Sequence, residues 1–243
     1  RPNLLDRPVG QRARIRRRRA VGALGRPFQD RMRDSPMTDI TVTHTAKTDA
    51  GVLTNHASPQ ASGAARHPGA TVWLTGLPSA GKTTIARALA VRLRAAGKNV
   101  EVLDGDELRT HLTAGLGFSR EDRDTNVRRV GFVARLLARN GVLVLVPVIA
   151  PYADARAQVR AAHDADAAAF VEVHVATSVD VCAERDVKGL YAKQRAGEVS
   201  GLTGVDDPYE IPQNPELRLE TAGRGVGDVA DQVYAALRER GLA

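Results

Sequence analysis

Hydrophobic residues follow two alternating patterns along the chain from Thr71 onward. Short runs rich in β-branched and apolar residues predict strands at 71–75, 100–103, 142–149, 171–175 and 217–219. Apolar residues at helical spacing predict helices at 82–96, after Ser119, at 154–163, at 179–185 and at 226–237. Strands that alternate with helices are typical of a three-layer α/β/α domain with a central parallel sheet.

The run from Val142 to Ile149 is apolar at nearly every position, as expected of a parallel strand that is covered on both faces. The longest unbroken apolar run, Val142 to Ala150, has nine residues and contains a proline. Since a helix needs about 20 residues to cross a bilayer, we expect no membrane span. Trp73 and Cys182 are expected to lie in the core of the domain.

The first part of the chain has a different composition. The formal net charge is +7, but residues 1–36 contain eleven arginines and only three aspartates, and the rest of the chain has 24 basic and 25 acidic residues. The strand and helix patterns predict that residues 69–243 are the folded domain. Outside residues 1–36 the chain has no surplus of positive charge with which to hold a nucleic acid. Residues 1–68 lack both periodic patterns and are predicted to be a disordered basic extension. Because Met37 opens a stretch of different composition, residues 1–36 can also be interpreted as lying upstream of the true start.

A phosphate-binding pattern, G-x-x-x-x-G-K-[ST], is matched between the first predicted strand and the first predicted helix. Backbone N–H groups of such a loop surround a β-phosphate, and the positive end of the following helix assists them. Lys82 is expected to bridge the β- and γ-phosphates of ATP, and the Thr83 hydroxyl to bind Mg²⁺. We assign ATP binding to Gly76, Leu77, Pro78, Ser79, Ala80, Gly81, Lys82, Thr83 and Thr84. This loop predicts the P-loop NTPase fold.

Two aspartates, Asp104 and Asp106, follow the second predicted strand with one glycine between them. Parallel sheets bind ligands at the carboxyl ends of their strands, where both side chains would lie. One carboxylate can belong to the metal shell while the other accepts a proton from an acceptor hydroxyl. The alternative is an ordinary Asp-Gly turn, but the neighbouring phosphate-binding loop favours the catalytic interpretation.

A further candidate group stands at the start of the helix predicted after Ser119, where Ser119 and Asp122 have capping-box spacing. Phe118 could stack on a base, and Arg123 and Asn126 could bind an anion. By spacing alone, a capped helix with solvated arginines is the favoured alternative.

Five segments in this order resemble adenylyl-sulfate (APS) kinase: residues 76–83, Leu103-Asp-Gly-Asp106, Gly117-Phe-Ser-x-x-Asp-Arg-x-x-Asn126, Lys188-Gly-Leu-Tyr191 and Gly204-Val-Asp-Asp-Pro-Tyr-Glu210. The resemblance implies ATP- and Mg²⁺-dependent phosphorylation of the APS 3′-hydroxyl, which gives 3′-phosphoadenylyl sulfate (PAPS) in sulfate assimilation. It implies that Asp106 is the base and Asp104 belongs to the Mg²⁺ shell, although these two roles can be exchanged. Matching positions imply APS binding by Arg109, Phe118, Arg123, Asn126, Ile149, Ala150, Lys188 and Leu202. A mobile lid is implied at about 188–210.

Several positions depart from the family pattern. Ala150 stands where some relatives carry a serine that is linked to a phosphoenzyme, so we expect direct in-line transfer. Leu202 stands where a second adenine-stacking phenylalanine is usual, which leaves an apolar wall without aromatic stacking. Val187 replaces a proline, and Ala153 replaces an arginine.

Two alternative functions stay open at this point. The chain could be another small-metabolite P-loop kinase with a different hydroxyl acceptor, or it could bind nucleic acid through its arginine-rich arm, which we regard as the weaker interpretation. The resemblance also implies a homodimer and an ATP sulfurylase partner. The single cysteine excludes an intramolecular disulfide and fits a reducing cytoplasm.

Overall fold

The computed structural model describes residues 69–243. Our predictions for the first 68 residues, namely the disordered extension, the basic arm and the alternative start at Met37, lie outside the described residues.

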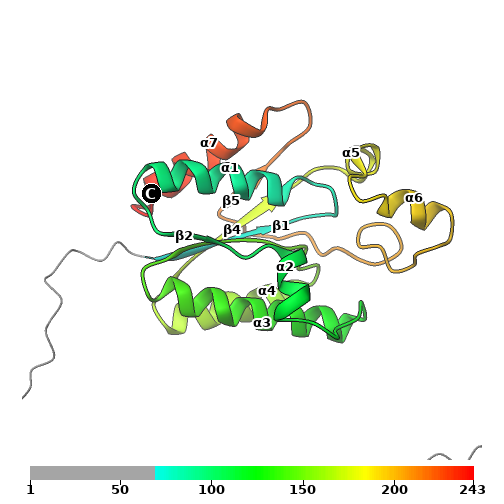
Figure 1. Ribbon diagram of the computed structural model, residues 1–243, viewed down its shortest axis with the longest axis horizontal. Coiled ribbons are helices and arrows are strands. Elements are labelled where there is room, and N and C mark those ends of the chain that lie inside the picture. Colours follow the sequence, from blue (N-terminus) through cyan, green and yellow to red (C-terminus); the bar gives the residue numbers. More distant parts are fainter. Residues whose placement is uncertain (1–68) are drawn as a thin grey trace, which may run out of the picture. The chain divides into compact units, whose positions relative to one another are not determined.

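Five parallel strands form the central sheet in the order β2-β3-β1-β4-β5 (Figure 1). The strands are β1 (Ala70–Thr75), β2 (Val100–Val102), β3 (Leu143–Pro147), β4 (Ala169–Val175) and β5 (Leu217–Leu219). All five lie within or beside the predicted ranges. The chain moves outward from β1 to β2 and later crosses to the other side of β1, so the strand order reverses beside β1. Open α/β sheets bind ligands at such a point, beyond the carboxyl ends of the strands.

Seven helices accompany the sheet in the described part of the chain. They are α1 (Lys82–Ala95), α2 (Gly105–His111), α3 (Arg120–Ala138), α4 (Ala153–Ala165), α5 (Val179–Arg185), α6 (Leu190–Arg195) and α7 (Val226–Glu239). Helices α1 and α7 cover one face of the sheet, and α3 and α4 cover the other (Figure 1). The fold is the three-layer α/β/α arrangement with a parallel sheet that the hydrophobic pattern predicted.

Burial explains why these segments form the layers. Every residue of β1 and β3 is buried, as expected for strands that are covered on both faces. On α1 the buried residues Ile85, Leu89 and Leu93 recur at helical spacing and pack in the cluster beneath α7. Trp73 and Cys182 are fully buried, so their predicted core positions are confirmed.

Helix α3 begins as its sequence predicted. The Ser119 side chain accepts a hydrogen bond from the backbone N–H of Asp122 (3.1 Å), which satisfies one of the free donors at the helix start. Farther along, Gly131 faces Val159 of α4 so closely that a Cβ would lie 2.6 Å from a valine methyl. This glycine therefore sets the spacing of the two helices on that face.

Two helices were not predicted. Gly105, in the expected Asp-Gly turn, begins α2, because the Asp104 side chain caps the helix by accepting from the N–H of Asp106 (3.0 Å). The short helix α6 lies within the expected lid segment. Conversely, β3 ends at Pro147, two residues before the predicted strand end, and Ala150 turns the chain with φ +44°.

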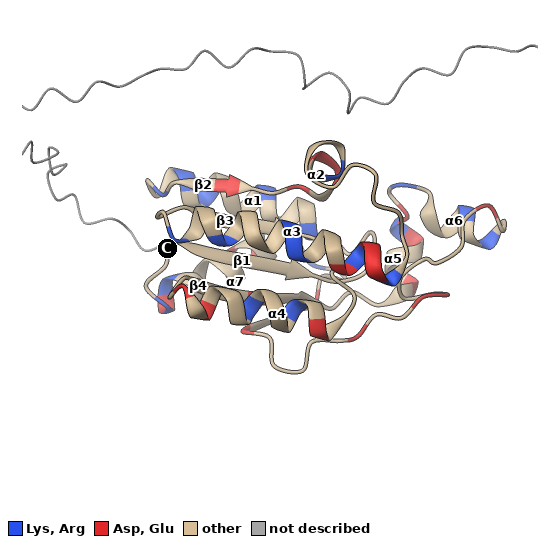
Figure 2. Ribbon diagram, turned by 90° about the horizontal axis from the view of Figure 1, so that it is seen from below, with Lys and Arg blue, Asp and Glu red and all other residues tan. Residues whose placement is uncertain are grey.

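Acidic and basic residues are scattered over several helices in the view of Figure 2 and do not form one block of like charge there. Within residues 69–243, no helix combines the length and the apolar character that crossing a membrane requires.

Candidate functional site

The phosphate-binding loop joins β1 to α1 at the carboxyl edge of the sheet. Gly76 has φ +155°, and a Cβ there would lie 2.5 Å from the carbonyl oxygen of Val175. Glycine is therefore required at position 76 by the close approach of β4. Gly81 caps α1 with φ +100°, and Ser79 also has a positive φ (+60°), so the loop is held in a conformation that L-residues rarely adopt.

Lys82 is almost fully buried at the start of α1. Its Nζ donates hydrogen bonds to the carbonyl oxygens of Gly76 (2.9 Å) and Leu77 (2.7 Å), which places the ammonium group across the loop. Burial lowers the pKa of Lys82 to about 8; the nearby Cys182 opposes this shift and the positive charge of Lys188 adds to it. A buried cation under a glycine loop is suited to binding phosphate oxygens.

Asp104 lies between the sheet and helix α2. One carboxylate oxygen caps α2, and the other accepts from Arg87 of α1 at 3.2 Å. No group of three potential metal-ligating side chains occurs within residues 69–243. Mg²⁺ needs only one or two protein oxygens when phosphates and water complete its shell, so the Thr83 hydroxyl and the Asp104 carboxylate are a suitable donor pair.

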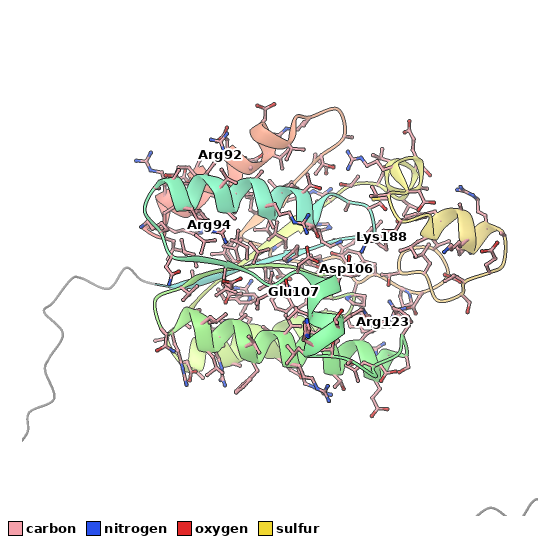
Figure 3. The ribbon with its side chains drawn as sticks, viewed as in Figure 1. Arg92, Arg94, Asp106, Glu107, Arg123 and Lys188 are labelled. Atoms are coloured by element: carbon pink, nitrogen blue, oxygen red, sulfur yellow. The ribbon has the colours of Figure 1, made fainter. Side chains whose placement is uncertain are left out.

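Asp106 lies on the first turn of α2 and forms an ion pair with Lys188 (Figure 3). The Lys188 Nζ lies 2.7 Å from Oδ1 and 2.5 Å from Oδ2 of Asp106. Both side chains are largely exposed, at 73% for Asp106 and 58% for Lys188. The structure thus joins two predicted site residues from distant segments at the open edge of the sheet.

Phe118 presents an exposed ring just before α3, with 67% of the residue accessible. The guanidinium carbon of Arg109 lies 4.5 Å from the ring centroid, so the arginine covers part of the ring. A flat ring with a cation beside it is suited to a ligand that combines an aromatic base with an anion.

Arg123 is buried and connects the Phe118 platform to the segment 201–207. Its Nε donates to the carbonyl oxygen of Phe118 (2.7 Å), and its other nitrogens contact Thr203, the carbonyl oxygen of Gly201 (2.6 Å) and Asp207 (3.1 Å). The predicted anion-binding arginine therefore ties the backbone of Phe118 to segment 201–207.

The same segment also packs on the phosphate-binding loop. Leu202 is buried in one hydrophobic cluster with Leu77, and Gly204 lies so close to Leu77 that a Cβ would collide with its side chain. A pocket of about 490 Å³ remains on this side, a volume in the range of small-molecule sites. It is lined by Leu77, Val179, residues 204–209 and Ile211.

The remaining predicted residues occupy the loop after β3 and the helix α3. The Ile149 carbonyl oxygen accepts a hydrogen bond from the Thr75 hydroxyl (2.5 Å), which ties that loop to the end of β1. Ala150 is buried, and Asn126 is half-buried one helical turn after Arg123. Thr84 is exposed on α1. Within residues 69–243, the side chains of Asn126 and Thr84 form no hydrogen bond or ion pair with the groups above.

Sequence reasoning gave no role to the residues that hold the end of the expected lid segment in place. Arg156 is buried, pairs with Glu172 at 2.9 Å, and donates to the carbonyl oxygens of Ala150 and Glu210 (2.7 Å each). The Tyr209 hydroxyl lies 3.0 Å from the Thr75 hydroxyl. Residues 206–210 belong to one of the five family-like segments, but their contacts with Thr75 of β1 and Arg156 of α4 depend on the fold.

Comparisons with known proteins identify one family. The family model described as adenylylsulphate kinase matches residues 68–220. An adenylyl-sulfate kinase from Rippkaea orientalis is 55% identical over 176 residues, which cover 72% of this chain and 95% of that protein.

Solved structures agree as well. The Mycobacterium tuberculosis APS kinase CysC, solved in complex with AMPPNP and APS, is 47% identical with a TM-score of 0.68; the match covers 70% of this chain and 98% of that chain. A hexameric APS kinase from Thiobacillus denitrificans is 40% identical with a TM-score of 0.56 and covers 73% of this chain and 30% of that chain. The expected resemblance is confirmed, and the chain belongs to the adenylylsulphate kinase family.

Proposed function

We propose that this protein transfers the γ-phosphate of ATP to the 3′-hydroxyl of adenylyl sulfate, which gives 3′-phosphoadenylyl sulfate. The family supports this reaction: relatives over 50% identical are named adenylyl-sulfate kinases, and a 47% identical relative was solved with an ATP analogue and APS.

One observation carries the proposal: segment 201–207 joins a phosphate cradle to an aromatic platform. On one side it packs on Leu77 of the phosphate-binding loop, and on the other it is bonded to Arg123, which also holds the backbone of Phe118. A donor triphosphate on the loop and an acceptor base on Phe118 would thus be bound by parts of one connected framework. Such alignment accounts for much of the catalysis in phosphoryl transfer.

The roles of individual residues are part of this proposal. Lys82 binds the β- and γ-phosphates, while Phe118 and Arg109 receive the adenine and the charged part of adenylyl sulfate. Asp106 accepts the proton of the 3′-hydroxyl, because its side chain is 73% exposed at the open edge of the sheet, whereas that of Asp104 is 15% exposed and is held by the α2 cap and by Arg87. Thr83 and Asp104 would hold Mg²⁺, which neutralises charge on the transferred phosphate when bound.

The decisive experiment is an assay with the full chain, ATP, Mg²⁺ and adenylyl sulfate, in which the 3′-phosphorylated product is separated by chromatography. Gluconate, shikimate and adenosine serve as competing acceptors, and Lys82→Ala controls for contaminating kinases. We expect product only with adenylyl sulfate and only with intact Lys82. Efficient transfer to another acceptor, with none to adenylyl sulfate, would replace this proposal by the small-metabolite kinase alternative.

We also propose that the chain self-associates, which the hexameric relative supports. Light scattering coupled to gel filtration of the full chain tests this, and a monomer at micromolar concentration would refute it.

The use of ATP supports a cytoplasmic location. An ATP sulfurylase is the proposed source of adenylyl sulfate, and a pull-down with such an enzyme tests a direct partnership.

A further inference from the structure

The carbonyl oxygen of Ala80, inside the phosphate-binding loop, receives an unusual set of donors. The Thr177 hydroxyl lies 3.1 Å from it, an Arg185 nitrogen 3.4 Å and the Thr221 hydroxyl 3.5 Å. Thr177 and Thr221 each stand two residues after a strand, β4 and β5 respectively, and both are buried. Two segments far apart in sequence, 177–185 and the loop after β5, therefore converge on one peptide group of the phosphate-binding loop.

The distances define a chain of hydrogen bonds. The Thr177 and Thr221 hydroxyl oxygens are 2.6 Å apart, and Arg185 donates to the Thr221 hydroxyl (3.0 Å) and to its carbonyl oxygen (3.1 Å). Since each hydroxyl has one proton, the shortest contacts are satisfied when Arg185 donates to Thr221, Thr221 to Thr177, and Thr177 to Ala80. The charge of Arg185 polarises the two hydroxyls along this chain and strengthens the last bond.

Holding this carbonyl has a consequence on the other side of the peptide. In a trans peptide the C=O of Ala80 and the N–H of Gly81 point in opposite directions. Fixing the carbonyl toward β4 and β5 turns the Gly81 N–H away from them, at the start of α1, where helix N–H groups lack intrahelical partners and bind anions. The positive φ angles of Ser79 and Gly81 show that the loop needs such support.

We propose that Thr177 and Thr221 are positioning residues of the phosphate-binding loop, whose hydroxyls orient the Ala80–Gly81 peptide for nucleotide binding. They act through the loop backbone and do not need to touch the nucleotide. The inference depends on the proposed function only in that this loop binds the phosphates of ATP.

Nucleotide titration tests this positioning role. The full chain and its Thr177→Val and Thr221→Val variants, which keep the shape and lose the hydroxyl, are titrated with ADP and Mg²⁺ by calorimetry. Each variant should raise the dissociation constant of ADP about three- to tenfold, which corresponds to the loss of one net hydrogen bond. Thr177→Ser and Thr221→Ser, which keep the hydroxyl, should restore binding. In the kinase assay the Val variants should raise KM for ATP and leave KM for adenylyl sulfate unchanged.

Thr71→Val is the matched control, because Thr71 is also buried and hydrogen-bonded, to His163 at 2.9 Å, but lies at the opposite end of β1. It should bind ADP like the wild type even if its melting temperature falls. Binding of ADP by both Val variants at the wild-type dissociation constant would overturn the proposal, as would Ser variants that bind as weakly as the Val variants.

Loss of folding and loss of kinase activity can each be distinguished from loss of loop positioning. If Thr177→Val does not fold, as judged by circular dichroism, Thr221→Val decides by the same criteria, and Thr177→Ser against wild type decides for position 177. ADP titration involves no acceptor. A wild-type chain that does not phosphorylate adenylyl sulfate would therefore refute the proposed function and leave the comparison of the threonine variants valid.

Discussion

Lys188 and Asp106, which are 82 residues apart in the sequence, form an ion pair at the carboxyl edge of the sheet, with Nζ 2.7 Å from Oδ1. The pair brings the proposed base together with the only lysine of the segment between α5 and α6 (Figure 3). Lys188 thus meets the acidic first turn of α2 directly, although both side chains are mostly exposed.

The first prediction concerns the carboxylate of this pair. Asp106→Asn should lower kcat by about 100-fold or more, the usual contribution of a general base, and should leave KM for ATP within about twofold. Steady-state kinetics with ATP and adenylyl sulfate measure both. Glu107→Gln is the control, because Glu107 is the neighbouring exposed carboxylate on α2 and should behave like the wild type. A comparable loss of ATP binding in Asp106→Asn would instead assign Asp106 to the metal shell.

The second prediction concerns the aromatic platform. Phe118→Ala should raise KM for adenylyl sulfate about two- to tenfold, as the loss of one stacking contact implies, and should leave KM for ATP unchanged. Phe132→Ala is the matched control: Phe132 is also exposed and also lies near an arginine, Arg135, but it stands in the middle of α3. Equal effects of the two substitutions would contradict a specific role for Phe118.

Local signals explain what the sequence could predict. The phosphate-binding loop and the cap at Ser119 depend on neighbouring residues, and the strand–helix alternation depends on short periodic patterns. Helix α2 was missed because it begins with a glycine, a poor helix former, and is stabilised by the Asp104 cap. The bonds of Arg123 to segment 201–207 were missed because they join residues about 80 positions apart. The sequence marked Arg123 as a site residue, but its hydrogen-bond partners depend on the fold.

The third prediction follows from the burial of Lys82, whose pKa is lowered to about 8. Below pH 8 the side chain is charged before a nucleotide binds. Above pH 8 the free protein must take up a proton when the phosphates bind, so the dissociation constant of ADP should rise by up to about tenfold per pH unit.

Calorimetric titration with ADP between pH 7 and pH 9.5 measures this dependence. Lys82→Arg is the control, because a guanidinium stays charged over this range, and its profile should be flatter even if its affinity is lower. A wild-type profile as flat as that of Lys82→Arg would contradict the assignment of the pH dependence to Lys82.

The last prediction concerns stability in acid and depends on His174 of β4. The ring is buried, stacks on Tyr209 with centroids 6.0 Å apart, and has Arg218 at 3.5 Å. Burial, with repulsion from Arg218 and Arg156, lowers the pKa of His174 to about 4. An unfolded histidine titrates near pH 6.5. The contribution of neutral His174 to stability is therefore complete above pH 6.5 and is lost as the pH falls toward 4, since only the unfolded chain binds the proton in that window.

His174→Gln cannot take up this proton. We expect it to be less stable than the wild type at pH 7, but to lose about 1–2 kcal/mol less of its unfolding free energy between pH 7 and pH 5. Urea denaturation at the two pH values measures the difference. His111→Gln is the control, because His111 is exposed on α2 and its removal should leave the acid dependence of the wild type. If His174→Gln and the wild type lost stability in parallel, the acid sensitivity would have to come from other groups, such as the buried His163, whose pKa burial also lowers.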